Sequence, residues 1–241
     1  MGFEKAPNRA SQVSLTASAV LFDKDGTLFD FNATWNGWTI GIIDYFSGGD
    51  ADVASRIAAA IEFDLGSRQF LPTSPVIAGT NREAAELVAS ALPGQNVAEI
   101  EQHLAISASR ADIVPAVPLS PYLNDLRSRG LKLGVMTNDT EMGAKAHLEA
   151  AGVIDRFDMV IGHDSGFGAK PDAAPLLAFA QHMGLAPHDV IMVGDSTHDL
   201  LAGRRAGMKT IGVLTGLATE DTLAPLADIV LPHIGHIPSL L

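Results

Sequence analysis

The stretch that most constrains the fold is a short apolar run that stops at two carboxylates. Residues 19–22 read as a buried strand, and Asp23-Lys24-Asp25-Gly26-Thr27 follows directly. Asp23 and Asp25 lie two positions apart, so they share one face of an extended chain, and Gly26 permits a turn that other residues resist. With no basic residue to neutralise both acids, the pair indicates a cation site or a nucleophile beside an acid/base group. The plainer alternative is a polar strand-to-turn transition.

The second half of the chain alternates helices with strands. Helical patterns cover 120–129, 140–151, 172–183, 197–206 and about 220–226, and strand patterns cover 132–138, 157–161, 190–195, 209–214 and 228–231. This alternation is typical of a parallel sheet that is covered by helices on both faces. We therefore expect an α/β fold whose core is a Rossmann-like, doubly wound parallel sheet formed by residues 17–29 and 115–241.

Residues 30–114 show no convincing strand pattern. Helical patterns cover 35–47, 51–63, 80–92 and 96–109. Asp50 is placed to cap the second helix, and Thr80 with Glu83 fits a capping box. We therefore expect an all-helical inserted domain between the two core segments. Residues 1–16 are expected to form a loose N-terminal lead-in.

Composition excludes several classes of function. The net charge of −12 disfavours nucleic acid and anionic membranes as partners, although a small anionic substrate remains possible. The chain has no cysteine, which excludes disulfides and thiolate chemistry and is compatible with a reducing cytoplasm. No apolar run reaches the roughly 18 to 20 residues that span a bilayer, and the N-terminus lacks a secretion-signal pattern. We expect a cytoplasmic protein, as a monomer or a homodimer.

A second pair of acids follows another strand. Asp195 ends the run 190–195, and Asp199 lies one helical turn further on. Because parallel strands end at one edge of a sheet, both are expected near Asp23. Such a cluster of hard oxygen ligands suits Mg²⁺. The alternative for Asp199 is a purely structural role, in which its negative charge stabilises the N-terminus of its helix.

Three further residues could bind an anion. Thr137 and Asn138 end the strand 132–138, where a hydroxyl and an amide could hold an anionic oxygen, although both residue types are common in turns and caps. Lys170 follows a Gly-rich loop and could point back at the acids and attract a phosphate. The alternative for Lys170 is a solvated surface charge.

The chain carries four motifs in the order Asp-x-Asp-Gly-Thr, Thr-Asn, Lys-Pro and Gly-Asp-Ser-x-x-Asp. Motifs of this kind in this order resemble those of the haloacid dehalogenase-like superfamily of phosphohydrolases. The resemblance covers residues about 17 to 232. The helical insert resembles the first type of cap domain in this family, which implies that it closes over the core with hinges near 29–34 and 113–121. Gly207-Met208 and the segment 212–216 are most similar to the phosphoglycolate phosphatase-like branch.

The resemblance implies a role for each motif. Asp23 would be the nucleophile that forms an aspartyl-phosphate, and Asp25 the general acid/base. Thr137 and Lys170 would bind the transferring phosphoryl group. Mg²⁺ would be held by Asp23, the backbone carbonyl of Asp25, Asp195 and, in or next to the shell, Asp199.

The expected activity is Mg²⁺-dependent hydrolysis of a small phosphorylated metabolite, such as phosphoglycolate or a sugar phosphate. Arg68 in the cap could hold a carboxylate of that substrate, or be an ordinary solvated arginine. Phe31 stands where the branch has a small serine, and Trp35 and Trp38 belong to the cap core or narrow the entrance. The alternatives are a phosphomutase, a 2-haloacid dehalogenase and a catalytically silent binding module.

Overall fold

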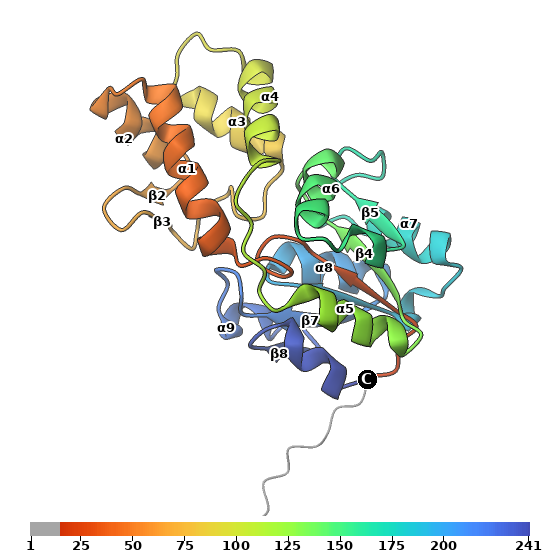
Figure 1. The fold of residues 1–241 in the computed structure, drawn as a ribbon. Coiled ribbons are helices and arrows are strands. Elements are labelled where there is room, and N and C mark those ends of the chain that lie inside the picture. Colours follow the sequence, from red (N-terminus) through yellow and green to blue (C-terminus); the bar gives the residue numbers. More distant parts are fainter. Residues whose placement is uncertain (1–14) are drawn as a thin grey trace, which may run out of the picture.

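The structure is a computed structural model that describes residues 15–241. Most of the lead-in expected at residues 1–16 therefore lies outside the described residues. The chain forms a sheet flanked by helices, and a separate group of helices, α1 to α4, stands beside it (Figure 1).

Six parallel strands form the central sheet, in the order β5-β4-β1-β6-β7-β8. Strand β1 lies in the middle, where Phe22 is opposite Val135 of β4 and Val193 of β6. The strands are β1 (Ala19–Phe22), β4 (Lys132–Met136), β5 (Met159–Ile161), β6 (Val190–Gly194), β7 (Lys209–Val213) and β8 (Ile229–Leu231). The predicted parallel sheet is confirmed, with strand ends one or two residues shorter than expected.

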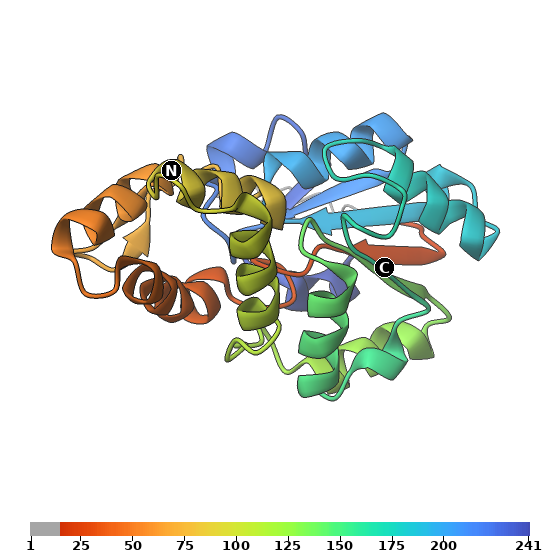
Figure 2. The same ribbon diagram turned by 90° about the horizontal axis from the view of Figure 1, so that it is seen from above.

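Helices cover both faces of the sheet, as the alternating pattern predicts. Val20 and Phe22 point to one face and pack with residues of α5 and α6, whereas Ala19 and Leu21 point to the other and pack with α7 and α8. Figure 2 shows α5 and α6, in green, opposite α7 and α8, in cyan and blue. The core helices are α5 (Leu119–Ser128), α6 (Glu141–Ala150), α7 (Ala174–Met183), α8 (Thr197–Ala206) and α9 (Glu220–Leu223), with short 3-10 turns η1 (Ile154–Arg156), η2 (Pro187–Asp189) and η3 (Ile234–Ser239).

The inserted segment has its own apolar core, formed around Ile43, Ile57 and Leu104. Asp50 caps its second helix, and Thr80 with Glu83 forms the expected capping box. The first helix begins at residue 31 rather than 35, because the Asp30 side chain accepts a hydrogen bond from the Ala33 amide at 2.8 Å. The four helices are α1 (Phe31–Ser47), α2 (Ala51–Ala60), α3 (Asn81–Ser90) and α4 (Val97–Ala108).

The expectation of an all-helical insert is wrong at one place. Strand β2 (Phe63–Asp64) pairs antiparallel with β3 (Gln69–Phe70). Phe63 and Phe70 are directly opposite, and their rings pack edge to face with centroids 5.0 Å apart. Two-residue strands are too short to show an alternating pattern, so the sequence gives no period to detect.

The two connections between sheet and insert run side by side. The Asp30 amide donates to the Val114 carbonyl at 2.8 Å, and the Ala116 amide donates to the Leu28 carbonyl at 2.9 Å. These contacts fall within or beside the segments expected to act as hinges. Within residues 15–241, no helix combines the length and the apolar character needed to cross a bilayer.

Candidate active site

The carboxyl ends of β1, β4 and β6 meet at one edge of the sheet and bring the motif residues together. Asp23 follows β1, Thr137 follows β4, and Asp195 follows β6. Asp199 comes from the first turn of α8, and Lys170 from the loop after β5. All five line a cavity of about 110 Å³, whose other wall is formed by the inserted helical segment.

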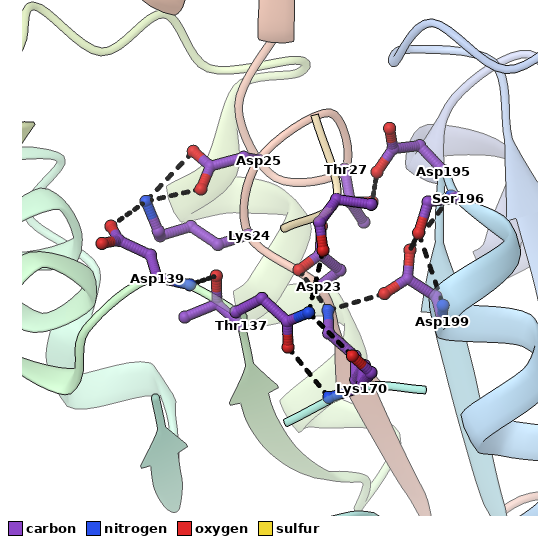
Figure 3. Close-up of polar contacts among 12 residues, drawn as sticks. Asp23, Lys24, Asp25, Thr27, Thr137, Asp139, Lys170, Asp195, Ser196 and Asp199 are labelled. Carbon is purple, nitrogen blue, oxygen red and sulfur yellow. Dashed lines mark hydrogen bonds and ion pairs between the residues drawn. The ribbon is translucent and has the colours of Figure 1, made fainter. Parts of the chain in front are cut away.

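Lys170 is the link between two of the acids. Its Nζ donates to Asp23 Oδ1 and to Asp199 Oδ1, both at 2.6 Å (Figure 3). Burial lowers the pKa of Lys170, but the charges of Asp199 and Asp23 outweigh it and raise that pKa above its ordinary value. Lys170 is therefore a fixed cation inside the site and not a solvated surface charge.

Three buried carboxylates surround this single ammonium. Oxygen atoms of Asp23, Asp195 and Asp199 all lie within 4.8 Å of one another. Burial, followed by the charges of Asp199 and Asp25, raises the pKa of Asp23 to about 7. Burial and the charges of Asp23 and Asp199 likewise raise the pKa of Asp195. This excess of negative charge in hard oxygen donors fits a divalent cation such as Mg²⁺.

The side chain of Asp25 does not belong to this acidic group. Lys24 Nζ lies 2.8 Å from Asp25 Oδ2 and 3.0 Å from Asp139 Oδ2, and the indole of Trp35 in α1 donates to Asp25 Oδ1 at 3.0 Å. As expected, no single basic residue neutralises both acids of the first pair, but the pair is not left without cations. Each acid has its own ammonium, because the chain bends after β1 and turns Lys24 toward Asp25.

His147 in α6 completes the group around Lys24. The Lys24 ammonium can only donate, so His147 Nδ1 accepts its hydrogen bond at 2.9 Å. His147 Nε2 then carries the proton and donates to the Ala108 carbonyl, at the end of α4, at 2.8 Å. Burial, followed by the charge of Lys24, lowers the pKa of His147 and keeps the ring neutral. This chain of contacts connects the helices around the sheet to the inserted helices.

Gly26 is needed for the turn that follows Asp25. Its φ is +79°, and a Cβ at this position would collide with the carboxylate of Asp195. The hydroxyl of Thr27 donates to Asp195 Oδ1 at 3.3 Å, and the hydroxyl of Thr215 donates to the Gly26 carbonyl at 2.6 Å. Thr27 thus joins the first motif to Asp195 after β6, and Thr215 joins the same motif to the segment after β7.

The two residues after β4 have different positions. Thr137 lines the cavity, and its hydroxyl oxygen accepts a hydrogen bond from the Asp139 amide at 3.1 Å, which leaves its proton for another acceptor. The Asn138 amide donates to the carbonyls of Ala78 and Lys170 and accepts from the Lys170 amide, each at 2.9 Å. Asn138 therefore positions Lys170 and a loop of the insert, and its amide is already engaged.

Arg68 is not brought to the site. It lies exposed in the turn between β2 and β3, with a φ of +59°, and it is not among the residues that line the cavity. Trp35 and Trp38, by contrast, pack against the core of the insert and also line the cavity.

The comparisons with known proteins agree with this geometry. The family model of haloacid dehalogenase-like hydrolases matches residues 17–207, and the chain belongs to this family. A structure of a putative haloacid dehalogenase-like hydrolase from Bacteroides fragilis has the same fold, with a TM-score of 0.71 and 20% identity over 92% of this chain and 99% of that one.

Curated relatives place the chain among phosphatases of the family. A probable phosphatase, IndB of Dickeya dadantii, is 32% identical over 85% of this chain and 84% of its own length. The phosphoglycolate phosphatase of Escherichia coli is 34% identical over 48% of this chain. That match spans 51% of the E. coli protein, and the match to a putative pyrophosphatase of Clostridium perfringens spans 42% of that protein. The predicted resemblance to the phosphoglycolate phosphatase-like branch is confirmed.

Sequence reasoning missed the second polar cluster, Lys24, Asp139 and His147. Lys24 is fully buried, but a lysine between two acids looks like an ordinary exposed charge in a sequence. Asp139 directly follows Asn138, so its place after a strand was a usable signal. His147 had none, because a single histidine in a helix is usually unremarkable.

Proposed function

We propose that this chain is a Mg²⁺-dependent phosphatase that hydrolyses a small phosphate monoester through an aspartyl-phosphate on Asp23. The observation that carries the proposal is the pairing of Asp23 with Lys170 at 2.6 Å, inside a cavity that also holds Asp195 and Asp199. A carboxylate nucleophile needs a neighbouring cation that also attracts the phosphoryl group. Family membership and the named phosphatase relatives support the same reaction class.

In the first step, an oxygen of Asp23 attacks phosphorus and the bond to the leaving oxygen breaks. Lys170 and the hydroxyl of Thr137 are close enough to the cavity to hold the phosphoryl oxygens by hydrogen bonds. Asp25, in its protonated form, gives its proton to the leaving alkoxide. In the second step, Asp25 accepts a proton from water, which attacks phosphorus and releases phosphate and free Asp23.

The three buried carboxylates would form the metal site. Asp23, Asp195 and Asp199 would hold Mg²⁺, together with the backbone carbonyl of Asp25. The ion would neutralise charge on the phosphoryl oxygens. The closeness of the three carboxylates and the raised pKa values of Asp23 and Asp195 support this assignment, because the negative charge of neighbouring acids disfavours the ionisation of both.

We further propose that residues 30–114 act as a cap over the core formed by residues 17–29 and 115–241. Phe31, Trp35 and Ile77 from this segment form the wall that faces Asp23. Such a wall would exclude water while the phosphoenzyme forms. The paired connections at Asp30 and Val114 support a hinge at that point.

The test is phosphate release from a panel of small phosphate monoesters, with Mg²⁺ or with EDTA. Release should require Mg²⁺ and fall by at least about a thousandfold in Asp23→Asn. Asp44→Asn, which changes an exposed carboxylate of α1, is the matched control and should keep the activity. Release that is unchanged in Asp23→Asn would refute the nucleophile, and transfer to a second sugar hydroxyl would indicate a phosphomutase.

A further inference from the structure

We propose that the cavity selects phosphate monoesters whose leaving group is uncharged and largely apolar, rather than one that carries a carboxylate or a second phosphate. This inference rests on the phosphatase function proposed above and names the substrate class.

The wall that faces the catalytic acids is apolar. Its apolar side chains come from α1, β3 and the segment between β3 and α3: Phe31, Trp35, Trp38, Phe70, Val76 and Ile77. Thr80 and Asn81 at the start of α3 also line the cavity, but the Thr80 hydroxyl is bonded to Glu83 and the Asn81 amide donates to the Glu101 carbonyl. The two indoles pack edge to face with centroids 5.2 Å apart, so they form one continuous aromatic surface. A leaving group that occupies this space gains by burying apolar area.

The cavity has little positive charge to offer a second anion. Among the described residues that line it, Lys170 is the only lysine or arginine, and it is already shared by Asp23 and Asp199. Five carboxylates line the same cavity, those of Asp23, Asp25, Asp139, Asp195 and Asp199. The second nearby ammonium, that of Lys24, is taken up by Asp25 and Asp139.

The arginines of the cap lie elsewhere. Arg68 is exposed outside the cavity, and Arg82 pairs with Glu86 at 2.8 Å and with Glu101 at 2.9 Å. Arg56 and Arg110 do not line the cavity. A carboxylate or phosphate on the leaving group would therefore be buried beside acids without a cation of its own, which is strongly unfavourable.

One polar group of the apolar wall is free. The Thr39 hydroxyl in α1 is buried, with 1% of the residue exposed, and it has no hydrogen-bond partner. The two indole N–H groups beside it are engaged, that of Trp35 with Asp25 and that of Trp38 with the Ser107 hydroxyl at 3.3 Å. Thr39 can thus meet one neutral polar group of the leaving group, such as a hydroxyl or carbonyl.

The experiment compares kcat/KM for benzyl phosphate, phosphoglycolate and pyrophosphate at saturating Mg²⁺. Benzyl phosphate and phosphoglycolate both release a primary alkoxide, so they differ mainly in the group that enters the cavity. We expect benzyl phosphate to be preferred by at least about tenfold. Ile77→Arg, which adds a cation to the wall, should shift the preference toward phosphoglycolate, whereas Ile77→Leu should retain the wild-type ratio.

The outcomes distinguish a failure of the substrate class from a failure of the phosphatase function. A wild-type preference for phosphoglycolate or pyrophosphate would overturn this inference and leave the phosphatase function standing. An unchanged ratio in Ile77→Arg would also overturn it, because the leaving group would not then occupy this wall. No Mg²⁺-dependent release from any ester would remove the proposed function, and this inference with it.

Discussion

The indole N–H of Trp35 donates a hydrogen bond to Asp25 Oδ1 at 3.0 Å, so a side chain of the inserted segment contacts the carboxylate that follows the first strand. The same indole packs against the ring of His147, with centroids 5.9 Å apart. This relationship makes the position of the insert and the position of Asp25 depend on each other. It links the two parts of the molecule at the site, as do the hydrogen bonds of Asn138 to the Ala78 carbonyl and of His147 to the Ala108 carbonyl.

The first prediction concerns this hydrogen bond. Trp35→Phe keeps an aromatic ring against Trp38 but removes the donor, and hydrogen bonds to charged groups contribute about 1.5–3 kcal/mol. We expect kcat/KM to fall by about tenfold or more because Asp25 loses its fixed position. Trp38→Phe removes a hydrogen bond to Ser107 instead, so it should cost less in kcat. Equal losses of kcat in the two variants would contradict a special role for the Trp35–Asp25 contact.

The second prediction concerns the buried ammonium of Lys24. Lys24→Met leaves the carboxylates of Asp25 and Asp139 without their cation, so the free energy of unfolding should fall by about 3–5 kcal/mol. Urea denaturation measures this change. Adding Asp139→Asn to the variant should restore part of the loss. Lys145→Met removes an exposed pair with Glu141 and should cost no more than about 0.5 kcal/mol.

The pH dependence of that stability follows from two pKa shifts. Burial would raise the pKa of Asp139, but Lys24 outweighs burial and lowers it. A carboxylate with a lowered pKa stabilises the fold above its ordinary pKa, and this stability is lost as the pH falls through the folded value. Burial would lower the pKa of Lys24, but Asp25 and Asp139 raise it, so its contribution is complete at neutral pH.

The difference in unfolding free energy between wild type and Lys24→Met should therefore be largest near neutral pH and narrow as the pH falls below about 4. Denaturation series at several pH values measure it. A difference that stays constant down to pH 3 would show that the Lys24–Asp139 pair is not its source.

The third prediction concerns the metal site. With a pKa of about 7, Asp23 is partly protonated at neutral pH in the metal-free protein. Because Mg²⁺ must displace that proton, its apparent affinity should rise as the pH increases through about 7. Calorimetric titration at pH 6 and pH 8 measures this, with Asp44→Asn as a control that keeps the pH dependence. Equal affinity at the two pH values would contradict the shifted Asp23.

The fourth prediction concerns two buried threonines of α1. Thr39→Val removes a hydroxyl that has no hydrogen-bond partner. The free energy of unfolding should therefore stay the same or rise by up to about 1 kcal/mol. Thr34 is a matched control, since it is also buried but its hydroxyl oxygen accepts from the Val114 amide at 3.1 Å. Thr34→Val should cost about 1–2 kcal/mol. Equal losses in both variants would show that Thr39 does have a partner.

The sheet and the acids Asp23 and Asp195 could be predicted because the sequence patterns that indicate them are local. Residues 19–22 are continuous apolar residues that end at Asp23, and 190–194 do the same before Asp195. The right order of helices and strands then places both ends at one edge of a parallel sheet. Lys170 could be expected in the site only from the resemblance, since a lysine after a loop is usually solvated.

The rest depends on contacts between distant parts of the chain. Lys24 reaches Asp139 and His147, which lie more than one hundred residues away, and no local pattern indicates that pairing. The Asn138 amide donates to the carbonyl of Ala78, and this contact depends on where the insert places Ala78. The charge of Arg68 suits a substrate carboxylate, but Arg68 lies in a hairpin turn away from the cavity. That position follows from the pairing of Phe63 with Phe70. Short elements of this kind form through tertiary packing rather than local preference.

The most direct test of the proposed mechanism is to find the phosphoryl group on the protein. The wild-type protein is mixed with Mg²⁺ and a monoester that it hydrolyses, quenched in acid within one turnover, and digested for mass spectrometry. We expect a phosphoryl group on Asp23 and on no other residue, and its absence from Asp23→Asn. Turnover at the normal rate with no phosphoryl group on Asp23 at any quench time would contradict covalent catalysis by this carboxylate.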